Sequence, residues 1–437
     1  MSEPTRTFKK LQLSGWRQFA SVDIDFHPRL TVLTGVNGVG KSTLLNILAR
    51  HVGVERPYLS VPRRNKEGGF TYWIGRITSS EWHLGPLALA GWSQKPKNQV
   101  GEVTYSDGAS AQLVVPDNVG SSYQINFVNQ QPIIGIAISS HRPLPAYRQI
   151  PHIPFTGIDP DQAYANFQTE SNTHYLGQRS DQSLIFHIKS AIAAWAVMGE
   201  GNSILQANQK QMDAYLGFAN ILRKILPESL GFMELSVRPP DVVMVTKSGD
   251  FLIDAASGGV AALIEFAALI YGCSIRPDVK GKQFVVTIDE PENHLHPSLQ
   301  RSLFLKLVEA FPLTQFITAT HSPFIVSSLK DSNVYVLKYN TLESVTEKTE
   351  ASRVASVRLD FANRAGTASE ILRDILGVPS TLPQWVEADL NKIVTKYQTR
   401  TIDETTLQEL RGELHDAGLE ELFSEALAGL ARSLQQR

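Results

Sequence analysis

The chain contains a single cysteine, Cys273, among 437 residues, so it has no internal disulfide framework. Disulfide bonds are rare in proteins that fold in a reducing cytoplasm, and we expect a cytoplasmic location. Cys273 follows an apolar run, which favours a buried, unreactive thiol over a reactive one. Small secreted proteins that depend on disulfides are therefore excluded as a class.

Long apolar runs and a strong charge of one sign are absent as well. The N-terminus lacks the apolar segment of a signal peptide, and we see no run of about 18 apolar residues that would span a membrane. The formal net charge is −2, so DNA contact would need a local basic patch. No long heptad run predicts a coiled coil. At this length we expect two or three lobes with cores of their own.

What the chain does contain is a phosphate-binding loop (P-loop), Gly-Val-Asn-Gly-Val-Gly-Lys-Ser-Thr at 35–43. An apolar strand over 30–34 precedes the loop and a helical pattern follows, as this motif requires. Glycines let backbone N–H groups curl around phosphates, and the helix N-terminus attracts the same anion. Lys41 would reach the β- and γ-phosphates of ATP, and the Ser42 hydroxyl would ligate Mg²⁺. The predicted nucleotide-binding residues of the loop are Gly35, Asn37, Gly38, Gly40, Lys41, Ser42 and Thr43.

A second motif is the apolar strand 284–288, which ends in two adjacent carboxylates, Asp289 and Glu290. Successive side chains of a strand face opposite sides, so the two acids can take different roles. We expect Asp289 to hold Mg²⁺ and Glu290 to polarise the attacking water as a general base. A solvated Asp-Glu turn is the alternative, and the presence of the P-loop favours the catalytic interpretation.

Two turns flank the carboxylate motif, one before it and one after it. The first, Ser257-Gly258-Gly259, opens an apolar helix, where a hydroxyl and bare backbone make an anion site. Such turns are common at helix starts, so this one is weak evidence alone. The second turn follows strand 315–319 and carries His321. A lone histidine is usually structural, so the functional prediction rests on its position relative to the other motifs.

In this order the motifs resemble the ABC ATPase superfamily, in its soluble Rad50/RecF-like branch. The Ser-Gly-Gly turn is similar to the signature motif of that superfamily, although Val260 stands where glutamine is expected and the leucine is absent. The resemblance implies that Ser257, Gly258 and Gly259 bind nucleotide and that His321 contacts the γ-phosphate. It also implies a head-to-tail dimer, in which the P-loop and signature of two subunits face each other across two ATP molecules.

Residues 290–297 and 320–323 are similar to the branch with the overcoming-lysogenization-defect proteins and the ATPase subunits of the Septu, retron and PARIS anti-phage systems. In that branch an aromatic and basic turn contacts the nucleotide. The resemblance therefore implies a nucleotide contact for Arg17, next to Trp16 in the turn Trp-Arg-Gln-Phe. Two ordinary surface side chains are the alternative for this pair.

Two further assignments stay open from the sequence. The equivalent of the Q-loop should follow strand 132–140, and the candidates are Ser140, Arg142 and Gln149. The pair His141-Arg142 can equally be a surface turn. The spacing of His294 and His296 suggests a metal site, but no third ligand is evident, so we favour a D-loop that packs against a second subunit.

We expect an α/β fold: a P-loop ABC-type ATPase head with an antiparallel β subdomain, a helical lobe carrying the signature motif, and a helical C-terminal tail. The predicted divisions are 1–150 (P-loop and antiparallel strands), 151–275 (helical lobe ending in the signature), 276–350 (carboxylate motif, D-loop and histidine) and 351–437 (helical, with possible partner docking).

Hydrophobic periodicity predicts the individual elements. Strands are expected at 70–78, 102–115, 123–128, 132–140, 284–288 and 315–319, with a hairpin over 233–253 that turns near 247–250. Helices are expected over 161–226, 259–272, 297–311, 323–330 and most of 366–435.

Residues 331–437 are expected to be mainly helical, and they contain no Asp-x-Asp pair. The TOPRIM nuclease that follows the ATPase in overcoming-lysogenization-defect proteins needs such a pair and a glutamate on strands, so we expect no nuclease activity from this chain itself. The leucines of the tail can either dock a partner or close its core. They are Leu407, Leu410, Leu414, Leu419 and Leu422.

The sequence thus predicts an ATP- and Mg²⁺-dependent switch subunit of an anti-phage complex, which forms a homodimer or higher oligomer and controls a separate nuclease or toxin. A RecF/Rad50-like repair or recombination ATPase that clamps DNA is the alternative, and it would show salt-dependent DNA binding. A non-hydrolysing scaffold and a transporter ATPase fit less well. The trigger, the effector and a direct contact with DNA or RNA are not indicated.

Overall fold

The computed structural model describes residues 5–64, 69–73, 98–117, 120–339, 354–359, 371–372, 383–398, 400, 403–424, 426–427 and 430. The chain forms two compact units, Met1–Ile371 and Leu372–Arg437. The first unit contains all of the motifs described above.

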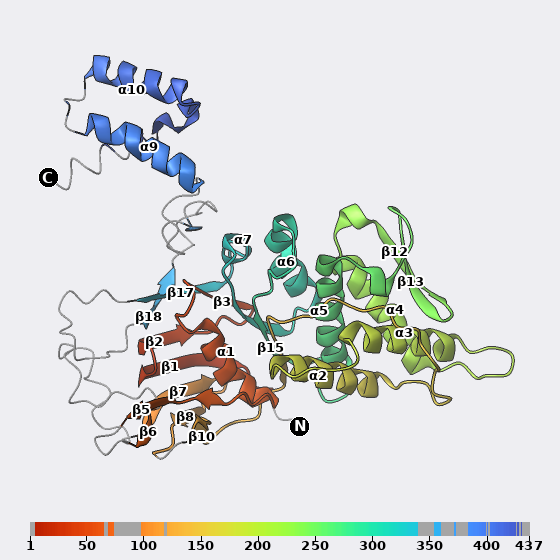
Figure 1. Ribbon diagram of the computed structural model, residues 1–437. Coiled ribbons are helices and arrows are strands. Elements are labelled where there is room, and N and C mark those ends of the chain that lie inside the picture. The colour runs from red at the N-terminus through yellow and green to blue at the C-terminus, as the bar shows by residue number, and fades with distance from the viewer. Residues whose placement is uncertain are drawn as a thin grey trace. The chain divides into compact units, whose positions relative to one another are not determined.

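An 11-stranded sheet runs through the first unit, in the order β10-β8-β7-β1-β2-β18-β17-β3-β16-β15-β11 (Figure 1). Its strands are β1 (Phe8–Trp16), β2 (Phe19–Asp25), β3 (Leu30–Thr34), β7 (Gln99–Tyr105), β8 (Ser110–Val114), β10 (Asn126–Val128), β11 (Gly135–Ile138), β15 (Phe284–Asp289), β16 (Thr314–Ala319), β17 (Asn333–Tyr339) and β18 (Val354–Leu359). Strands β1, β2, β7, β8 and β10 pair antiparallel, while β17, β3, β16, β15 and β11 run parallel.

The parallel strands are buried on both faces, and this position explains their composition. Every residue of β3 and of β16 is buried, and apart from Gln315, whose amide is hydrogen-bonded to Phe8, both strands consist of apolar residues and threonine. The helix α1 (Lys41–Ala49) follows β3 directly, and α6 (Pro297–Ala310) connects β15 to β16. Because parallel strands end at the same edge, the loops that follow β3, β15 and β16 lie together.

The helical lobe lies beside the β11 end of the sheet (Figure 1). It consists of α2 (Pro160–Tyr175), α3 (Leu184–Glu200), α4 (Gln209–Ile225) and α5 (Gly258–Ile275), with a small sheet of β12 (Phe232–Arg238), β13 (Asp241–Thr246) and β14 (Phe251–Leu252). Capping residues set the starts of the helices: Asp159 accepts from the Asp161 N–H before α2, and Ser183 accepts from the Phe186 N–H before α3.

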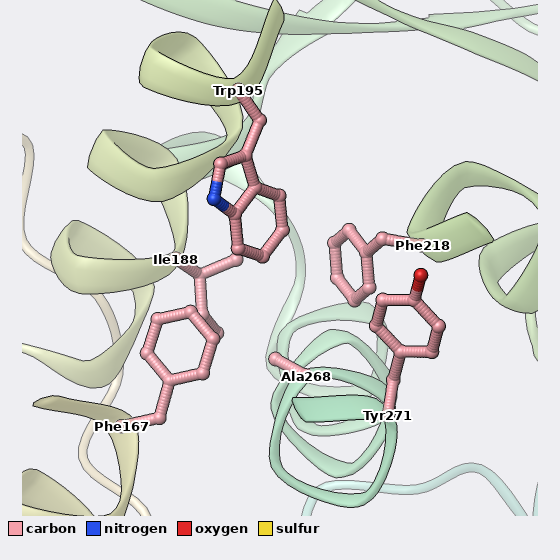
Figure 2. Close-up of a pocket in the computed structure, with 6 residues that line it drawn as sticks. All are labelled: Phe167, Ile188, Trp195, Phe218, Ala268 and Tyr271. Carbon is pink, nitrogen blue, oxygen red and sulfur yellow. The ribbon is translucent and has the colours of Figure 1, made fainter. Parts of the chain in front are cut away.

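The core of the helical lobe is aromatic. In Figure 2, side chains from all four helices converge on one gap, which is too narrow to admit a water molecule. They are Phe167, Ile188, Trp195, Phe218, Ala268 and Tyr271. The indole N–H of Trp195 donates to the Ile158 carbonyl over 2.9 Å, so its one polar atom is satisfied.

The helix α5 is apolar enough to span a membrane by length and composition alone, with a mean hydropathy of 1.7 over 18 residues. The expectation that no such run exists was therefore wrong. However, 78% of this segment is buried inside the protein, and it carries the buried Glu265. We conclude that α5 is the central helix of the lobe.

Small elements complete the first unit. The pair β4 (Tyr58–Leu59) and β9 (Ser122–Tyr123) and the pair β5 (Val61–Arg64) and β6 (Phe70–Trp73) form two-stranded sheets. Short 3₁₀ turns lie at Arg50–Val52, Glu228–Leu230 and Ile253–Ala255. Most of the strand predicted at 70–78 lies outside the described residues, and 70–73 form β6.

Three sequence expectations need correction. The segment 233–253 forms two hairpins: the predicted turn at 247–250 joins β13 to the short antiparallel β14, and a turn at Pro239–Pro240, which was not predicted, joins β12 to β13. The helix predicted at 323–330 is one turn, α7 (Pro323–Val326). Residues after 331 are not mainly helical at first, because β17 and β18 pair with each other and join the central sheet. The predicted helical division from 351 therefore begins with a sheet strand.

The second unit contains α9 (Gln384–Tyr397), α10 (Glu404–Asp416) and a 3₁₀ turn at Glu420–Leu422. Most of the predicted helical segment before 383 lies outside the described residues. The two helices share a core with Leu410, Leu414 and Leu419 fully buried, while Leu422 is partly buried against it and Leu407 is half-buried. Leu410, Leu414 and Leu419 therefore close the core of the tail, and partner docking by this region remains a prediction.

We expect Trp195→Ala to lower the free energy of unfolding by about 3–5 kcal/mol, because it removes a large side chain that is 2% exposed from a packed core. Urea denaturation measures the change. The matched control is Leu216→Ala on α4, where the leucine is 55% exposed and little change is expected. Equal losses from the two variants would contradict the placement of Trp195 in the core.

Candidate nucleotide-binding site

The P-loop follows β3 and has the backbone shape of a phosphate cradle. Gly35 and Gly40 have φ values of 139° and 99°, which favour glycine. A Cβ on Gly35 would lie 2.4 Å from the Leu337 carbonyl oxygen, and one on Gly40 would lie 2.5 Å from the Phe19 ring. Both positions therefore exclude larger residues, and the β1–β2 turn packs directly against the loop.

Lys41 begins α1 and points back into the loop. Its side chain is buried, and the Nζ donates to the carbonyls of Gly35 (2.9 Å) and Val36 (3.2 Å). Burial lowers the pKa of Lys41 to about 8, against the opposing pull of Asp289, Glu290 and Glu292. An anion bound in the cradle would replace the two carbonyls as partner of this ammonium and favour its charged form.

Asp289 ends β15 beside Ser42, the first residue after Lys41. Burial raises the pKa of Asp289 to about 6; a hydrogen bond from Ser42 lowers it, and repulsion by Glu290 adds to the rise. One carboxylate oxygen, Oδ1, is buried and has no hydrogen-bond partner in the described part of the chain. A hydroxyl next to an unpartnered carboxylate oxygen fits the oxygen ligands that Mg²⁺ prefers.

Glu290 has a φ of 47°, a backbone conformation that is uncommon outside glycine. Three contacts hold it there: its N–H donates to Ala319 O (2.9 Å), its carbonyl accepts from Arg142 Nη2 (2.9 Å), and its Oε2 accepts from Asn293 Nδ2 (3.1 Å). Strained backbone that several contacts maintain is typical of functional sites. These three contacts fix the orientation of the Glu290 carboxylate at the end of β15.

The segment after β11 supplies one buried residue among the three Q-loop candidates. Arg142 is 7% exposed, donates to Ser139 O (2.8 Å) and Glu290 O, and lies 5.0 Å from the ring centroid of Phe266 on α5. Ser140 is half-buried and Gln149 is exposed. The surface-turn alternative is therefore wrong for Arg142, which links the carboxylate loop to the signature helix. His141 is exposed.

His321 follows β16, and a carboxylate from the neighbouring loop fixes its backbone. The His321 N–H donates to Glu292 Oε1 over 2.6 Å. Burial, followed by repulsion from Lys41, lowers the pKa of His321, so its imidazole is neutral at neutral pH. Ser322 then caps α7 by accepting from the N–H groups of Phe324 and Ile325. The structure therefore brings Lys41, Ser42, Asp289, Glu290 and His321 to one edge of the sheet.

The Ser-Gly-Gly turn lies apart from this group within one chain. Ser257 is exposed at the start of α5, and its side chain makes no capping hydrogen bond. A Cβ on Gly259 would lie 2.9 Å from the His294 carbonyl oxygen, so the turn packs against the loop after β15. In the described part of the chain, no hydrogen bond joins Ser257, Gly258 or Gly259 to the P-loop.

The two candidate residues of the turn between β1 and β2, Trp16 and Arg17, differ in burial. Trp16 is fully buried, and its indole N–H donates to the Tyr123 hydroxyl over 3.0 Å. The surface alternative is therefore wrong for Trp16, and a direct nucleotide contact by this ring is excluded in this arrangement. Arg17 is half-buried, with its guanidinium 5.7 Å from the centroids of the Trp16 and Tyr58 rings. A nucleotide contact by Arg17 remains a prediction.

The two histidines of the loop after β15 do not gather ligands. His296 caps α6 by accepting from the Ser298 N–H (3.3 Å), and His294 is exposed. Over the described ranges, no cluster of three His, Cys, Asp or Glu residues could hold a metal ion by itself.

The sequence reasoning missed two side chains of this site. Asn293 orients the Glu290 carboxylate, and Glu292 holds the backbone of His321. Both residues lie within three positions of Glu290 in the sequence. A tight turn there would have predicted that their side chains lie close to the site. Burial raises the pKa of Glu292, and its Oε2 lacks a partner among the described residues.

Comparisons with known proteins support the same assignment. Residues 247–327 match the family model "AAA domain, putative AbiEii toxin, Type IV TA system", and residues 10–69 match the model "AAA domain". These matched segments contain the P-loop at one end of the chain and the carboxylate and histidine motifs at the other.

Two sequence relatives agree with this assignment, and one solved structure shows a low overall similarity. The Septu protein PtuA of Bacillus mycoides (strain KBAB4) is 22% identical over 411 residues, which are 90% of this chain and 47% of that protein. The Retron Ec83 probable ATPase of Escherichia coli is 41% identical over 54 residues, 12% of this chain and 10% of that protein. The SMC head domain from Thermotoga maritima has a TM-score of 0.39 at 15% identity, covering 81% of this chain and 99% of that one.

The motif order and the sequence matches support the resemblance of the chain to the ABC-type ATPases of the Rad50/OLD-like branch. Within this branch it is similar to Septu and retron ATPases. The resemblance seen in the motifs is thus confirmed, and so is the α/β P-loop fold. The chain spans about half the length of the curated Septu relatives that it matches.

We expect Mg²⁺ to bind more weakly as the pH falls through about 6, because Asp289, with a pKa of about 6, is then protonated and loses its charge. A titration of Mg²⁺ against the protein with a fluorescent ATP analogue, at several pH values between about 5 and about 7.5, measures this. The phosphates of the nucleotide also titrate in this pH range. Asp289→Asn is therefore the reference, because its Mg²⁺ affinity changes with pH only through the nucleotide. A constant difference between the two proteins would contradict the role of Asp289.

Proposed function

We propose that the chain binds and hydrolyses ATP and acts as the switch subunit of an anti-phage defence complex. The observation that carries this proposal is the convergence of a cationic loop, two carboxylates and a neutral histidine at the edge where β3, β15 and β16 end. Similarity to the Septu protein PtuA and to a retron ATPase supports the defence context.

Each residue of the cluster has a proposed role in hydrolysis. Lys41 and the P-loop N–H groups bind the β- and γ-phosphates, and Mg²⁺ held by Ser42 and Asp289 would neutralise part of their charge. Glu290 orients the attacking water and accepts its proton. A neutral imidazole at His321 can donate a hydrogen bond to the γ-phosphate.

The remaining roles need a second subunit. The Ser257 hydroxyl is exposed and free of capping, and the first N–H groups of α5 are available beside it, which suits them for a phosphate. Since they lie apart from the P-loop of their own chain, we assign them to the nucleotide of a partner copy in a head-to-tail dimer. ATP would stabilise the closed dimer and hydrolysis would reopen it.

The proposed organisation follows from these roles. The segments 1–150 and 276–350 form the ATPase head, 151–275 carries the signature, and the tail beyond 351 contributes a sheet strand and a helical unit. A separate effector, a nuclease or a toxin, would read the closed state. The cytoplasm is the proposed location, and the buried thiol of Cys273 is consistent with a reducing compartment.

We expect Glu290→Gln to reduce ATP turnover by about 10²–10⁴-fold, because the amide cannot accept the proton of the attacking water. Nucleotide binding should persist and the ATP-bound dimer should accumulate in size-exclusion chromatography. Glu309→Gln, on the exposed face of α6, is the control and should turn over normally. Normal turnover by Glu290→Gln would assign the general base to another residue.

We expect Lys41→Ala to abolish nucleotide binding and Ser257→Arg to abolish turnover by blocking the site of the partner subunit. Equal mixing of these two inactive variants should restore about a quarter of wild-type turnover, because half of the dimers are mixed and each has one intact site. Phosphate release from the mixture is the readout. Absence of rescue would overturn the shared-site dimer. It would not affect the P-loop assignment, which nucleotide binding by Lys41→Ala tests separately.

A further inference from the structure

A lysine is completely buried in the helical lobe. The side chain of Lys189 on α3 has 0% exposure, and its three N–H donors each reach an oxygen. The partners are Asp254 Oδ2 (2.6 Å), Asp241 Oδ1 (2.7 Å) and the Arg148 carbonyl (2.7 Å). Burial lowers the pKa of Lys189, but the two carboxylates outweigh this effect and raise it above its ordinary value. The ammonium is therefore charged and fully satisfied.

The three partners of Lys189 belong to three separate segments. Arg148 lies in the chain after β11, Asp241 begins β13, and Asp254 lies in the 3₁₀ turn Ile253–Ala255. This turn leads within three residues to Ser257, the exposed start of α5. One ammonium thus ties the segment that leads into the signature turn to the body of the helical lobe, while the turn itself contacts His294.

The chemistry of this cluster suits it to holding a backbone turn in place more than to stabilising the fold. One cation faces two carboxylates, and Asp254 Oδ1 is buried without a partner among the described residues. Well-packed apolar residues often replace such buried ion clusters without loss of stability, so stability alone is weak grounds for keeping one. A short charged contact does fix the place of a backbone turn, because it fails when either end moves.

We propose that Lys189, acting through Asp254, is the positioning residue that holds the signature turn in place for the nucleotide of the partner subunit. This inference rests on the proposed shared-site dimer. It assigns to a residue buried behind the turn a function that acts in trans: loss of Lys189 should spoil the site to which its subunit donates the signature, and leave the P-loop of its own subunit competent.

The first test uses Lys189→Met, which keeps the unbranched shape and most of the length of the side chain and removes the charge. We expect unchanged nucleotide binding and a roughly 100-fold loss of turnover, the scale at which small displacements affect catalysis. The control is Lys210→Met in the same lobe, where the lysine pairs with Asp159 on the exposed surface and turnover should not change. If Lys189→Met turns over normally, the inference is wrong.

Removal of one partner from a buried pair can prevent folding, so a second variant is needed. Lys189→Met/Asp254→Asn removes the charges of this pair together and leaves only the carboxylate of Asp241, which is 13% exposed. Thermal melting verifies that the variant is folded, and we expect the same loss of turnover. Asp241→Asn leaves the bond between Lys189 and Asp254 in place and should retain most of the activity. An equal loss in Asp241→Asn would mean that the cluster acts through the whole lobe, which would overturn the role assigned to Asp254.

Mixing experiments separate positioning in trans from a general structural defect. Lys189→Met mixed with Lys41→Ala should recover activity, because the intact P-loop of the former meets the intact signature of the latter. Lys189→Met mixed with Ser257→Arg should not recover, because both subunits then lack a working signature. The reverse pattern, or no recovery in either mixture, would overturn the inference. The mixture of Lys41→Ala with Ser257→Arg tests the shared-site dimer itself. A failure of the dimer model can therefore be distinguished from a failure of the role proposed for Lys189.

Discussion

The whole site depends on the parallel alignment of β3, β16 and β15. Because these strands run in one direction and are buried on both faces, their carboxyl ends share an edge, and the chain must place polar loops there. Residues separated by more than 200 positions, such as Lys41 and Glu290, thereby come under each other's electrostatic influence. The helical lobe then adds a second set of contacts through Arg142, which touches both the Glu290 carbonyl and the ring of Phe266.

The cluster is electrostatically unbalanced without nucleotide. Three carboxylates, Asp289, Glu290 and Glu292, face two cations: the guanidinium of Arg142 and the ammonium of Lys41, which burial brings to a pKa of about 8. Two carboxylate oxygens of this group lack hydrogen-bond partners among the described residues. Such imbalance is costly in a folded protein unless a ligand supplies the missing partners. A nucleotide with its cation would supply opposite charge at both ends of the cluster.

The sequence predicts motifs made of adjacent residues well. It does not predict the contacts of the site that join residues far apart in the chain. The P-loop and the carboxylate pair each consist of a strand and its following turn, so a few adjacent residues specify them. Arg142 could not be assigned, since its partners lie 148 and 151 positions away. Trp16 stayed open between a nucleotide-contacting turn and a surface position, because Tyr123, which covers it, is 107 positions distant. The strands β17 and β18 were missed because the amphipathic helices farther along dominated the expectation for the tail.

The position of β18 has a consequence for how the chain folds during synthesis. This strand lies between β2 and β17, so the N-terminal strands reach β3 only through residues made more than 300 positions later. Until residues 333–359 have left the ribosome, the P-loop lacks the Leu337 backbone that packs against Gly35. Long-range pairing of this kind slows folding and leaves sheet edges exposed in the meantime. The nascent chain therefore gains a supported nucleotide site only after β17 and β18 have emerged.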